Sequence, residues 1–166
     1  MKCLECGESA VEKTSTLENP YPYKESGLAN VFLVGVRVTS CACGEESVLI
    51  PKIGQLNDLI ARNLVEKKGL LDGRELKYLR KYAGFPANKF AALLTIDPAY
   101  LSRVENGKVK NLGGTADKLA RALVAAARDK EYMKNVLLAV DENRIDVEQS
   151  KARPIFQLVS NRWKAA

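Results

Sequence analysis

The stretch from Leu71 to Asn111 reads LDGRELKYLRKYAGFPANKFAALLTIDPAYLSRVENGKVKN, and it contains the signals for three successive helices. Asp72 can cap the first helix, and Glu75, three residues later, can complete a capping box. Pro86 can open the second helix, and Asp97-Pro98 is a cap followed by a proline at the first helical position. The stretch therefore predicts one helix followed by two short helices across a tight turn, which is the helix-turn-helix arrangement.

Each of the three segments also has an apolar face at helical spacing. The residues expected to face inward are Leu76, Leu79 and Ala83 in the first helix, Phe90, Ala91 and Leu94 in the second, and Leu101 and Val104 in the third. Gly84 and Gly107 are the expected stops, because glycine adopts the left-handed conformation at a helix end without steric cost.

Three pieces of this stretch, LRKYAGF, KFAALL and YLSRVENGKVK, resemble the Xre/Cro/lambda-repressor type of helix-turn-helix. The resemblance implies that the third helix is a recognition helix for the major groove of DNA. It also implies a structural ion pair between Arg80 of the first helix and Glu105, the residue before Asn-Gly. Relatives often carry glutamine at the position of Ala87, where its amide contacts the DNA backbone. Alanine cannot make that contact, which leaves open a protein-interaction adaptor that kept a degenerate helix-turn-helix.

The side of the third helix expected to face DNA is the one opposite its apolar face. Arg103 on that side suits a bidentate contact to guanine, and lysines after the helix suit phosphates. The other interpretations are an intramolecular ion pair for Arg103 and solvated charges for the lysines. The candidate DNA-binding residues are Ala99, Tyr100, Ser102, Arg103, Lys108, Lys110, Asn88 and Lys89.

The only four cysteines, Cys3, Cys6, Cys41 and Cys43, form two pairs that are each followed by glycine. Two such pairs can supply a tetrahedral site of four thiolates for Zn²⁺, with Zn–S distances of about 2.3 Å. The chain contains no histidine, and a closed four-thiolate shell leaves no position for a reacting water, so the expected zinc is structural and the expected protein is not an enzyme. The second pair is spaced C-x-C, one residue shorter than the usual knuckle. Disulfide-linked or metal-free cysteines and a rubredoxin-type iron site are the alternatives.

The remaining segments predict a small β module, a linking helix and a helical body. Strands are expected from Tyr21, over Val31 to Thr39 and from Ser47, and a helix over residues 54–68. After the helix-turn-helix, Thr115 is the expected cap of a helix with Leu119, Ala120, Leu123 and Ala127 on one face. Another helix is expected over 131–140, and the tail over 141–166 can hold a strand or a dimerisation arm. The predicted domains are 1–52, 53–69, 70–140 and 141–166.

Charge is unevenly distributed along the chain, whose formal net charge is +6. Residues 1–50 hold 4 basic and 7 acidic side chains, a net charge of −3, whereas residues 51–166 hold 22 and 13, a net charge of +9. A basic body suits a polyanion, and an acidic head suits a basic protein. No run of 18 apolar residues and no apolar leader is present, so no membrane span is expected, and we expect a cytoplasmic protein whose cysteines bind metal.

The order of these parts resembles the MqsA/YgiT-type zinc-finger/helix-turn-helix family over about residues 1–128, and GLLDGRELKYLRKYAGF carries much of that resemblance. The implied fold class is α+β, with a small N-terminal zinc-bound β module joined by a helix to an all-α Xre/lambda-repressor-like domain. The resemblance implies a homodimeric transcriptional repressor that binds a palindromic operator in double-stranded DNA. Members include antitoxins whose zinc module binds a toxin, here expected to be a basic protein. A stand-alone regulator without a toxin is the alternative within the same family.

Overall fold

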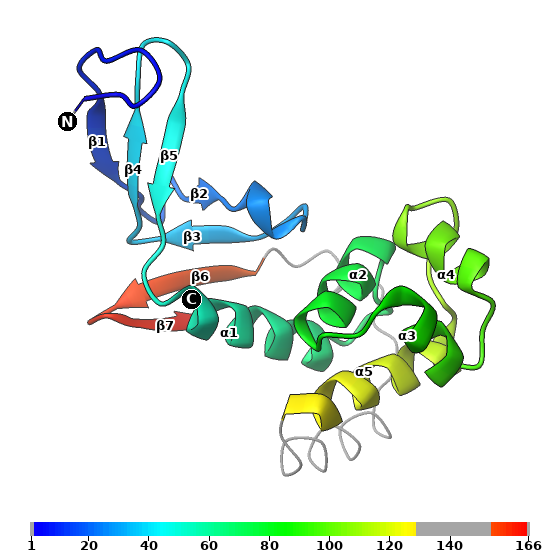
Figure 1. The fold of residues 1–166 in the computed structure, drawn as a ribbon. Helices are drawn as coiled ribbons and strands as arrows, with labels where there is room; N and C mark the ends of the chain where they lie inside the picture. The colour runs from blue at the N-terminus through cyan, green and yellow to red at the C-terminus, as the bar shows by residue number, and fades with distance from the viewer. Residues whose placement is uncertain (1, 129–153, 166) are drawn as a thin grey trace. The chain divides into compact units, whose positions relative to one another are not determined.

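The computed structural model describes residues 2–128 and 154–165, which form an α+β fold with five α-helices and two β-sheets (Figure 1). The helices are α1 (Ile53–Glu66), α2 (Gly73–Tyr82), α3 (Ala87–Leu93), α4 (Pro98–Glu105) and α5 (Gly114–Arg128). The strands are β1 (Val11–Thr14), β2 (Tyr21–Pro22), β3 (Phe32–Val34), β4 (Arg37–Ser40), β5 (Glu46–Leu49), β6 (Ile155–Val159) and β7 (Arg162–Ala165). The helix predicted over 131–140 and the first part of the tail, 141–153, lie outside the described residues.

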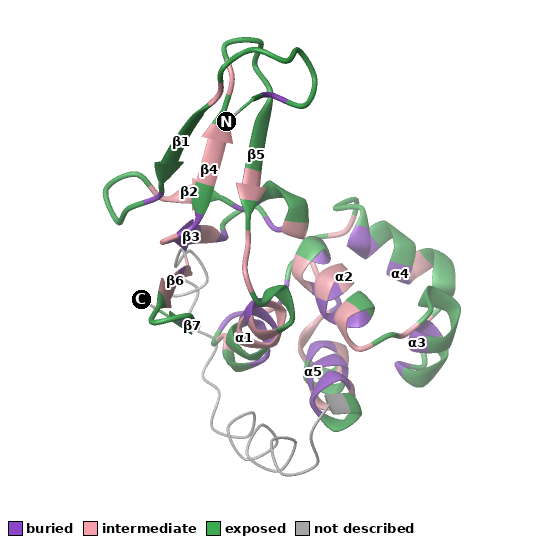
Figure 2. Cartoon of the chain, turned by 60° about the vertical axis from the view of Figure 1, so that its left-hand side comes forward, coloured by how far each residue is buried: buried purple, intermediate pink, exposed green. Residues whose placement is uncertain are grey.

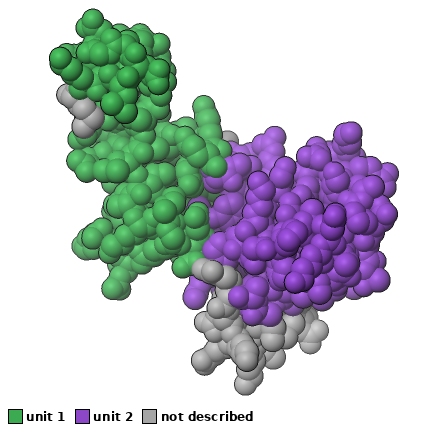
Figure 3. All heavy atoms as spheres, viewed as in Figure 1, with its two compact units in different colours: residues 1–25, 30–59, 153–166 green, residues 26–29, 60–152 purple. Residues whose placement is uncertain are grey.

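The chain divides into two compact units (Figure 3). Unit 1 comprises residues 1–25, 30–59 and 153–166, and unit 2 comprises residues 26–29 and 60–152. The division falls inside α1, where the sequence predicted an independent linking helix. The C-terminal strands belong to the same unit as the four cysteines, so this part of the tail is a component of unit 1.

The first sheet of unit 1 has the order β1-β4-β5, with both neighbouring pairs antiparallel. No residue of its three strands is buried, and all four residues of β1 are exposed (Figure 2). A sheet normally buries at least one face against another layer of structure. This sheet has a backbone ladder but very little apolar core.

The second sheet of unit 1 has the order β2-β3-β6-β7, and it joins the two ends of the described chain. Strands β3 and β6 are parallel, with Leu33 opposite Phe156, and both side chains are fully buried. Trp163 of β7 is also buried, and its Nε1 donates a hydrogen bond of 3.0 Å to the carbonyl oxygen of Pro51. Apolar packing therefore stabilises the second sheet, in contrast to the first.

The single strand predicted over residues 31–39 is wrong, because the chain breaks at Gly35 and Val36 and the two halves enter different sheets. Gly35 has a φ of +82°, which a strand residue does not adopt. The break is held by Ser15, whose N–H donates to the oxygen of Val36 and whose hydroxyl accepts the N–H of Val36 at 3.1 Å. One residue outside the predicted strand thus decides where it ends.

Unit 2 is built around the helices that the opening stretch predicts. Asp72 and Glu75 form the capping box of α2, and Asp97 accepts hydrogen bonds from the first N–H groups of α4. Pro86 is the N-cap of α3 rather than its first helical residue. The fully buried apolar side chains include Leu79 of α2, Phe90 of α3 and Leu101 of α4. These helices enclose a common core, and α4 packs against both α2 and α3.

The apolar face predicted for α5 is partly wrong, because Leu119 is 40% exposed while Asp117 and Arg121 are 3% and 2% exposed. The guanidinium of Arg121 pairs with Asp117 at 2.7 Å and donates hydrogen bonds to four main-chain oxygens at and beyond the end of α1. These oxygens belong to Leu64, Val65, Lys67 and Gly69. Terminal carbonyls of a helix have no partner within the helix, so a buried arginine stabilises them here.

None of the helices in the described ranges is long and apolar enough to cross a membrane.

Candidate functional site

Two loops at one end of the first sheet bring the four cysteines together. Cys3 and Cys6 precede β1, and Cys41 and Cys43 lie in the turn between β4 and β5. The Sγ atoms of Cys3 and Cys43 are 3.7 Å apart and those of Cys6 and Cys41 are 3.5 Å apart. All four Sγ atoms lie within 4.8 Å of one another. These distances exceed the S–S bond length of about 2.05 Å, and all four cysteines are free thiols.

The geometry fits a tetrahedral metal ion. Four sulfur atoms at about 2.3 Å from a central ion lie about 3.8 Å from each other. The two glycines that follow the pairs, Gly7 and Gly44, have φ angles of +75° and +91°. Each permits a tight turn, with the N–H of Gly7 bonded to the oxygen of Cys3 and that of Gly44 to Cys41. The four cysteines are therefore a site that could hold a metal ion, and the C-x-C spacing is compatible with the cluster.

The electrostatics of the cluster also favour a cation. Backbone N–H groups, first that of Cys6 and then that of Glu5, lower the pKa of Cys3 to about 7. For Cys43 the backbone at Glu45 lowers the pKa, but the neighbouring thiols, Cys41 and Cys6 first, together with burial raise it to about 12. Four thiolates this close repel one another, so complete deprotonation requires a bound cation, which would displace the remaining protons.

A second candidate surface is the outer side of α4. Ala99, Ser102 and Arg103 are exposed, and Tyr100 is half-buried. The guanidinium carbon of Arg103 lies 5.8 Å from the ring centroid of Tyr100, within the range of a cation–π contact. Ser102 accepts a hydrogen bond from the side chain of Asn106.

The other four candidate residues lie on neighbouring segments of unit 2. Lys108 and Lys110 follow α4 directly, and Asn88 and Lys89 lie in the first turn of α3. All four are exposed. The eight candidates thus lie on or near the molecular surface of α3, α4 and the segment that follows α4.

The inner side of α4 is fixed by a buried ion pair. Arg80 donates to both carboxylate oxygens of Glu105, at 2.6 and 2.9 Å, and also to the carbonyl oxygen of Phe85. Each of the two charged residues is 8% exposed. Because the carboxylate accepts two parallel bonds from a planar guanidinium, the pair fixes the orientation of the end of α4 as well as its distance from α2.

Gly73 makes a second contact between α2 and α4. A Cβ atom at this position would lie 1.8 Å from the carbonyl oxygen of Val104, so no side chain fits without movement of the backbone. The sequence alone did not reveal this role of Gly73, nor the buried pair of Asp117 and Arg121. The sequence held one indication of this role, because Gly73 stands at the first position of a helix although most other residues have a higher helix propensity than glycine.

Comparison of the chain with protein-family models, with curated proteins and with solved structures finds no match.

Proposed function

We propose that the chain is a sequence-specific DNA-binding transcriptional repressor that reads its operator with α4 and carries a structural zinc ion in unit 1. The observation that carries this proposal is the two-sided character of α4. One side is buried through Leu101, Val104 and Glu105, and the other presents Ala99, Ser102 and Arg103 to solvent. A short helix with a fixed inner side and a polar outer side is what docking in the major groove requires.

The charge of unit 2 supports a polyanionic partner. Residues 60–128 contain 14 basic and 6 acidic side chains, a net charge of +8. Two of the acidic residues, Glu105 and Asp117, are neutralised inside the unit by arginines. The exposed lysines of this unit, among them Lys89, Lys108 and Lys110, can bind phosphates, and each such contact makes the affinity for DNA depend on salt.

The proposed division of labour follows from the positions of the side chains. Arg103 reads guanine through its O6 and N7 atoms, and the nearby ring of Tyr100 restricts the motion of the guanidinium before DNA arrives. Lys108 and Lys110 bind phosphates beside the groove, as do Asn88 and Lys89 at the start of α3. The Arg80–Glu105 pair and the contact of Gly73 with Val104 hold α4 at the angle that this docking needs.

We further propose that the repressor acts as a homodimer. Two copies of α4 separated by one turn of DNA, about 34 Å, would read the two halves of a palindromic operator.

For unit 1, the proposed metal is zinc in a structural role. Four thiolates close the tetrahedron, so no position remains for substrate or reactive water. An iron site of the same ligands is distinguished by elemental analysis and by visible absorbance of the purified protein.

The test of DNA recognition is selection of genomic fragments by the full chain, followed by affinity measurements on the selected site over a range of salt concentrations. Arg103→Ala should cost about 1–3 kcal/mol and relax the base preference at one position in each half-site. Lys108→Ala should weaken binding to all sequences and reduce the salt slope by about one. Lys118→Ala, an exposed charge on α5, is the matched control and should leave the base preference unchanged.

Binding that does not depend on sequence, or a base preference unaffected by Arg103→Ala, would contradict the proposed recognition. No binding to DNA, together with stable protein partners, would instead establish the adaptor.

The antitoxin version of this function adds a protein partner for the N-terminal part of the chain. The net charge of −3 over residues 1–50 favours a basic partner. Affinity purification from native cells, analysed by mass spectrometry and DNA sequencing, distinguishes the two versions. A small basic protein recovered with the protein's own promoter supports the antitoxin, and DNA recovered alone supports the stand-alone regulator.

A further inference from the structure

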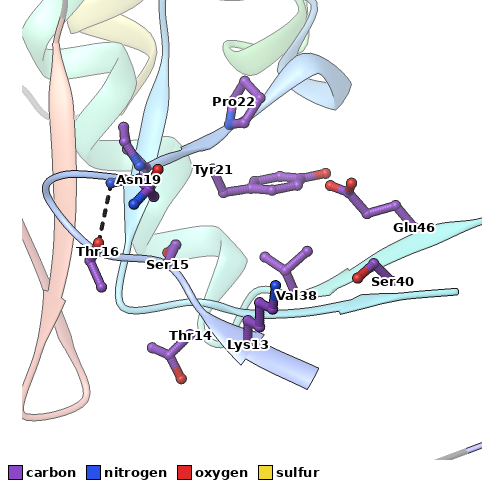
Figure 4. Close-up of a pocket in the computed structure, with 11 residues that line it drawn as sticks. Lys13, Thr14, Ser15, Thr16, Asn19, Tyr21, Pro22, Val38, Ser40 and Glu46 are labelled. Atoms are coloured by element: carbon purple, nitrogen blue, oxygen red, sulfur yellow. Dashed lines mark hydrogen bonds between the residues drawn. The ribbon is translucent and has the colours of Figure 1, made fainter. Parts of the chain in front are cut away.

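Unit 1 contains a cleft that is separate from the four cysteines. It has a volume of about 520 Å³ and is lined by residues of β1, the loop after β1, β2, β4 and β5 (Figure 4). Sites for small molecules and cofactors typically measure about 300–1,000 Å³. The cleft therefore has room for a ligand the size of an amino acid or for one large side chain of a partner.

One side of the cleft is formed by an aromatic ring. Tyr21 is half-buried, and its neighbours in the sequence, Pro20 and Pro22, also line the cleft. Val38 contributes an apolar surface on the central strand of the first sheet. These residues offer a flat apolar contact to a planar group.

The hydroxyl end of Tyr21 lies in a negative environment. Its O–H donates to Oε1 of Glu25 at 2.9 Å, and it is turned toward the carboxylate of Glu46 (Figure 4). Burial, and then the hydrogen bond and the charges of Glu25 and Glu46, raise the pKa of Tyr21 far above its usual value. This end of the cleft consequently attracts a cation.

Lys13 places a positive charge on the same face of the first sheet as Glu46. Lys13 pairs with Val38 across β1 and β4, and Ser40 pairs with Glu46 across β4 and β5. Since alternate residues share a face, Lys13 and Glu46 are on one face, two strands and two residues apart. That separation is about 12 Å between Cα atoms. Both side chains are exposed, and both line the cleft.

An aromatic ring beside a carboxylate, with an ammonium group at a distance, complements one kind of group in particular. A guanidinium is planar, so it stacks on tyrosine and forms paired hydrogen bonds with a carboxylate. The ammonium of lysine is not planar and is less suited to both interactions. The carboxylate or carbonyl at the other end of an arginine would meet Lys13.

We propose that this cleft binds an arginine, with its guanidinium on the ring of Tyr21 beside Glu46 and its carboxylate or main-chain carbonyl at Lys13. Free arginine and an arginine residue of a peptide share this chemistry. The site lies wholly in unit 1, and the proposal does not depend on DNA binding by α4.

The test is calorimetric titration of the full metal-loaded chain with L-arginine, agmatine, L-citrulline and a tripeptide with a central arginine. We expect saturable binding of L-arginine or of the tripeptide, with a dissociation constant of about 1 mM or lower. Citrulline, which has a neutral planar group, should bind at least about tenfold more weakly. Agmatine lacks the carboxylate and should also bind more weakly than L-arginine. Preference for the tripeptide assigns the site to a protein partner, and preference for L-arginine assigns it to a small-molecule ligand.

The variants separate the site from general charge effects. Glu46→Gln should weaken arginine binding about tenfold or more, whereas Glu12→Gln, on the opposite face of the same sheet, should leave it unchanged. Lys13→Met should remove the difference between L-arginine and agmatine. All three replaced side chains are exposed, so the fold should tolerate the changes. Absence of binding by L-arginine and by the tripeptide, or equal losses in Glu46→Gln and Glu12→Gln, would overturn the proposal.

Discussion

The first sheet of unit 1 and the helices of unit 2 differ in how much of their side-chain surface is buried. The strands β1, β4 and β5 contain no buried residue, while α2, α3 and α4 share a core that includes Leu79, Phe90 and Leu101. The sheet ends in four thiols placed for a metal ion, and the helical unit contains two buried arginine–carboxylate pairs. Apolar burial is normally the dominant favourable contribution to folding, so the sheet needs another source of stability.

We propose that a metal ion bound by the four cysteines gives the first sheet the stability that the apolar core gives the helices. Structural zinc sites contribute folding free energy directly, and many small domains unfold without their metal. The second sheet of unit 1 is an internal reference, because it has a core of its own around Leu33, Phe156 and Trp163. Only the sheet without such a core is expected to depend strongly on the metal.

The largest single effect is expected in the helical unit, from Arg121→Ala. This change leaves Asp117 and the carbonyl oxygens at the end of α1 buried without their partner, which should reduce the free energy of unfolding by about 3–5 kcal/mol. Chemical denaturation followed by helical circular dichroism measures it. Lys118→Ala on the same helix is the control and should change stability by less than about 0.5 kcal/mol. Equal stability of the two variants would contradict the role of Arg121.

A smaller effect is expected from Glu105→Gln, because the amide keeps the shape and one acceptor but removes the charge opposite Arg80. The loss should be about 1–3 kcal/mol. Glu75→Gln on α2 is a comparison at a part-buried pair with Lys67 and should cost less. Thermal unfolding of both variants gives the ranking, and a greater loss for Glu75→Gln would reverse our assignment of the pair that orients α4.

A still smaller effect is expected in unit 1 from Gly7→Ala. Alanine at a φ of +75° should cost about 1–2 kcal/mol, with no steric clash because no atom outside the adjoining residues lies within 4 Å of the new Cβ. The cost should appear as weaker metal binding, measured by competition with a chelator. Gly54→Ala in α1, which has no positive φ and the same open space, is the control and should leave metal affinity unchanged. A metal affinity equal to wild type in Gly7→Ala would show that the site does not need glycine at this position.

The smallest effect at neutral pH concerns Tyr21. Its pKa is raised in the folded chain, first by burial and then by Glu25, so its ionisation opposes folding only above the unfolded pKa of about 10. Stability of unit 1 should therefore be unaffected by this group below that pH and fall as pH rises beyond it. Tyrosine ionisation can be followed by spectrophotometric titration of the wild type and of Tyr21→Phe. The variant should lack a tyrosine that ionises at a pH above the usual range. A normal titration of that phenol would contradict the negative environment in the cleft.

The features that the sequence predicts well are those specified by residues close together in the chain. The capping box of Asp72 and Glu75, the Asp97-Pro98 start of α4 and the inward position of Leu101 all follow from spacings of a few residues. The clustering of the cysteines is a long-range feature, yet it was predictable because four thiols in two glycine-flanked pairs have few other uses in such a chain.

The features that were missed depend on partners distant in sequence. The buried position of Arg121 depends on carbonyl groups more than 50 residues away, and charged side chains are poor candidates for burial by composition alone. The break at Gly35 depends on Ser15, and β6 finds a parallel partner in β3 from the other end of the chain. Strand β1 has no buried residue, so it lacks the apolar alternation by which strands are recognised.

The measurement that tests this comparison most directly is hydrogen exchange of the full chain, followed by mass spectrometry, before and after removal of the metal with a chelator. We predict that β1, β4 and β5 lose protection, that α2, α4 and α5 keep theirs, and that added zinc restores the sheet. Loss of protection in the helices together with the sheet, or an unchanged sheet without metal, would contradict the account.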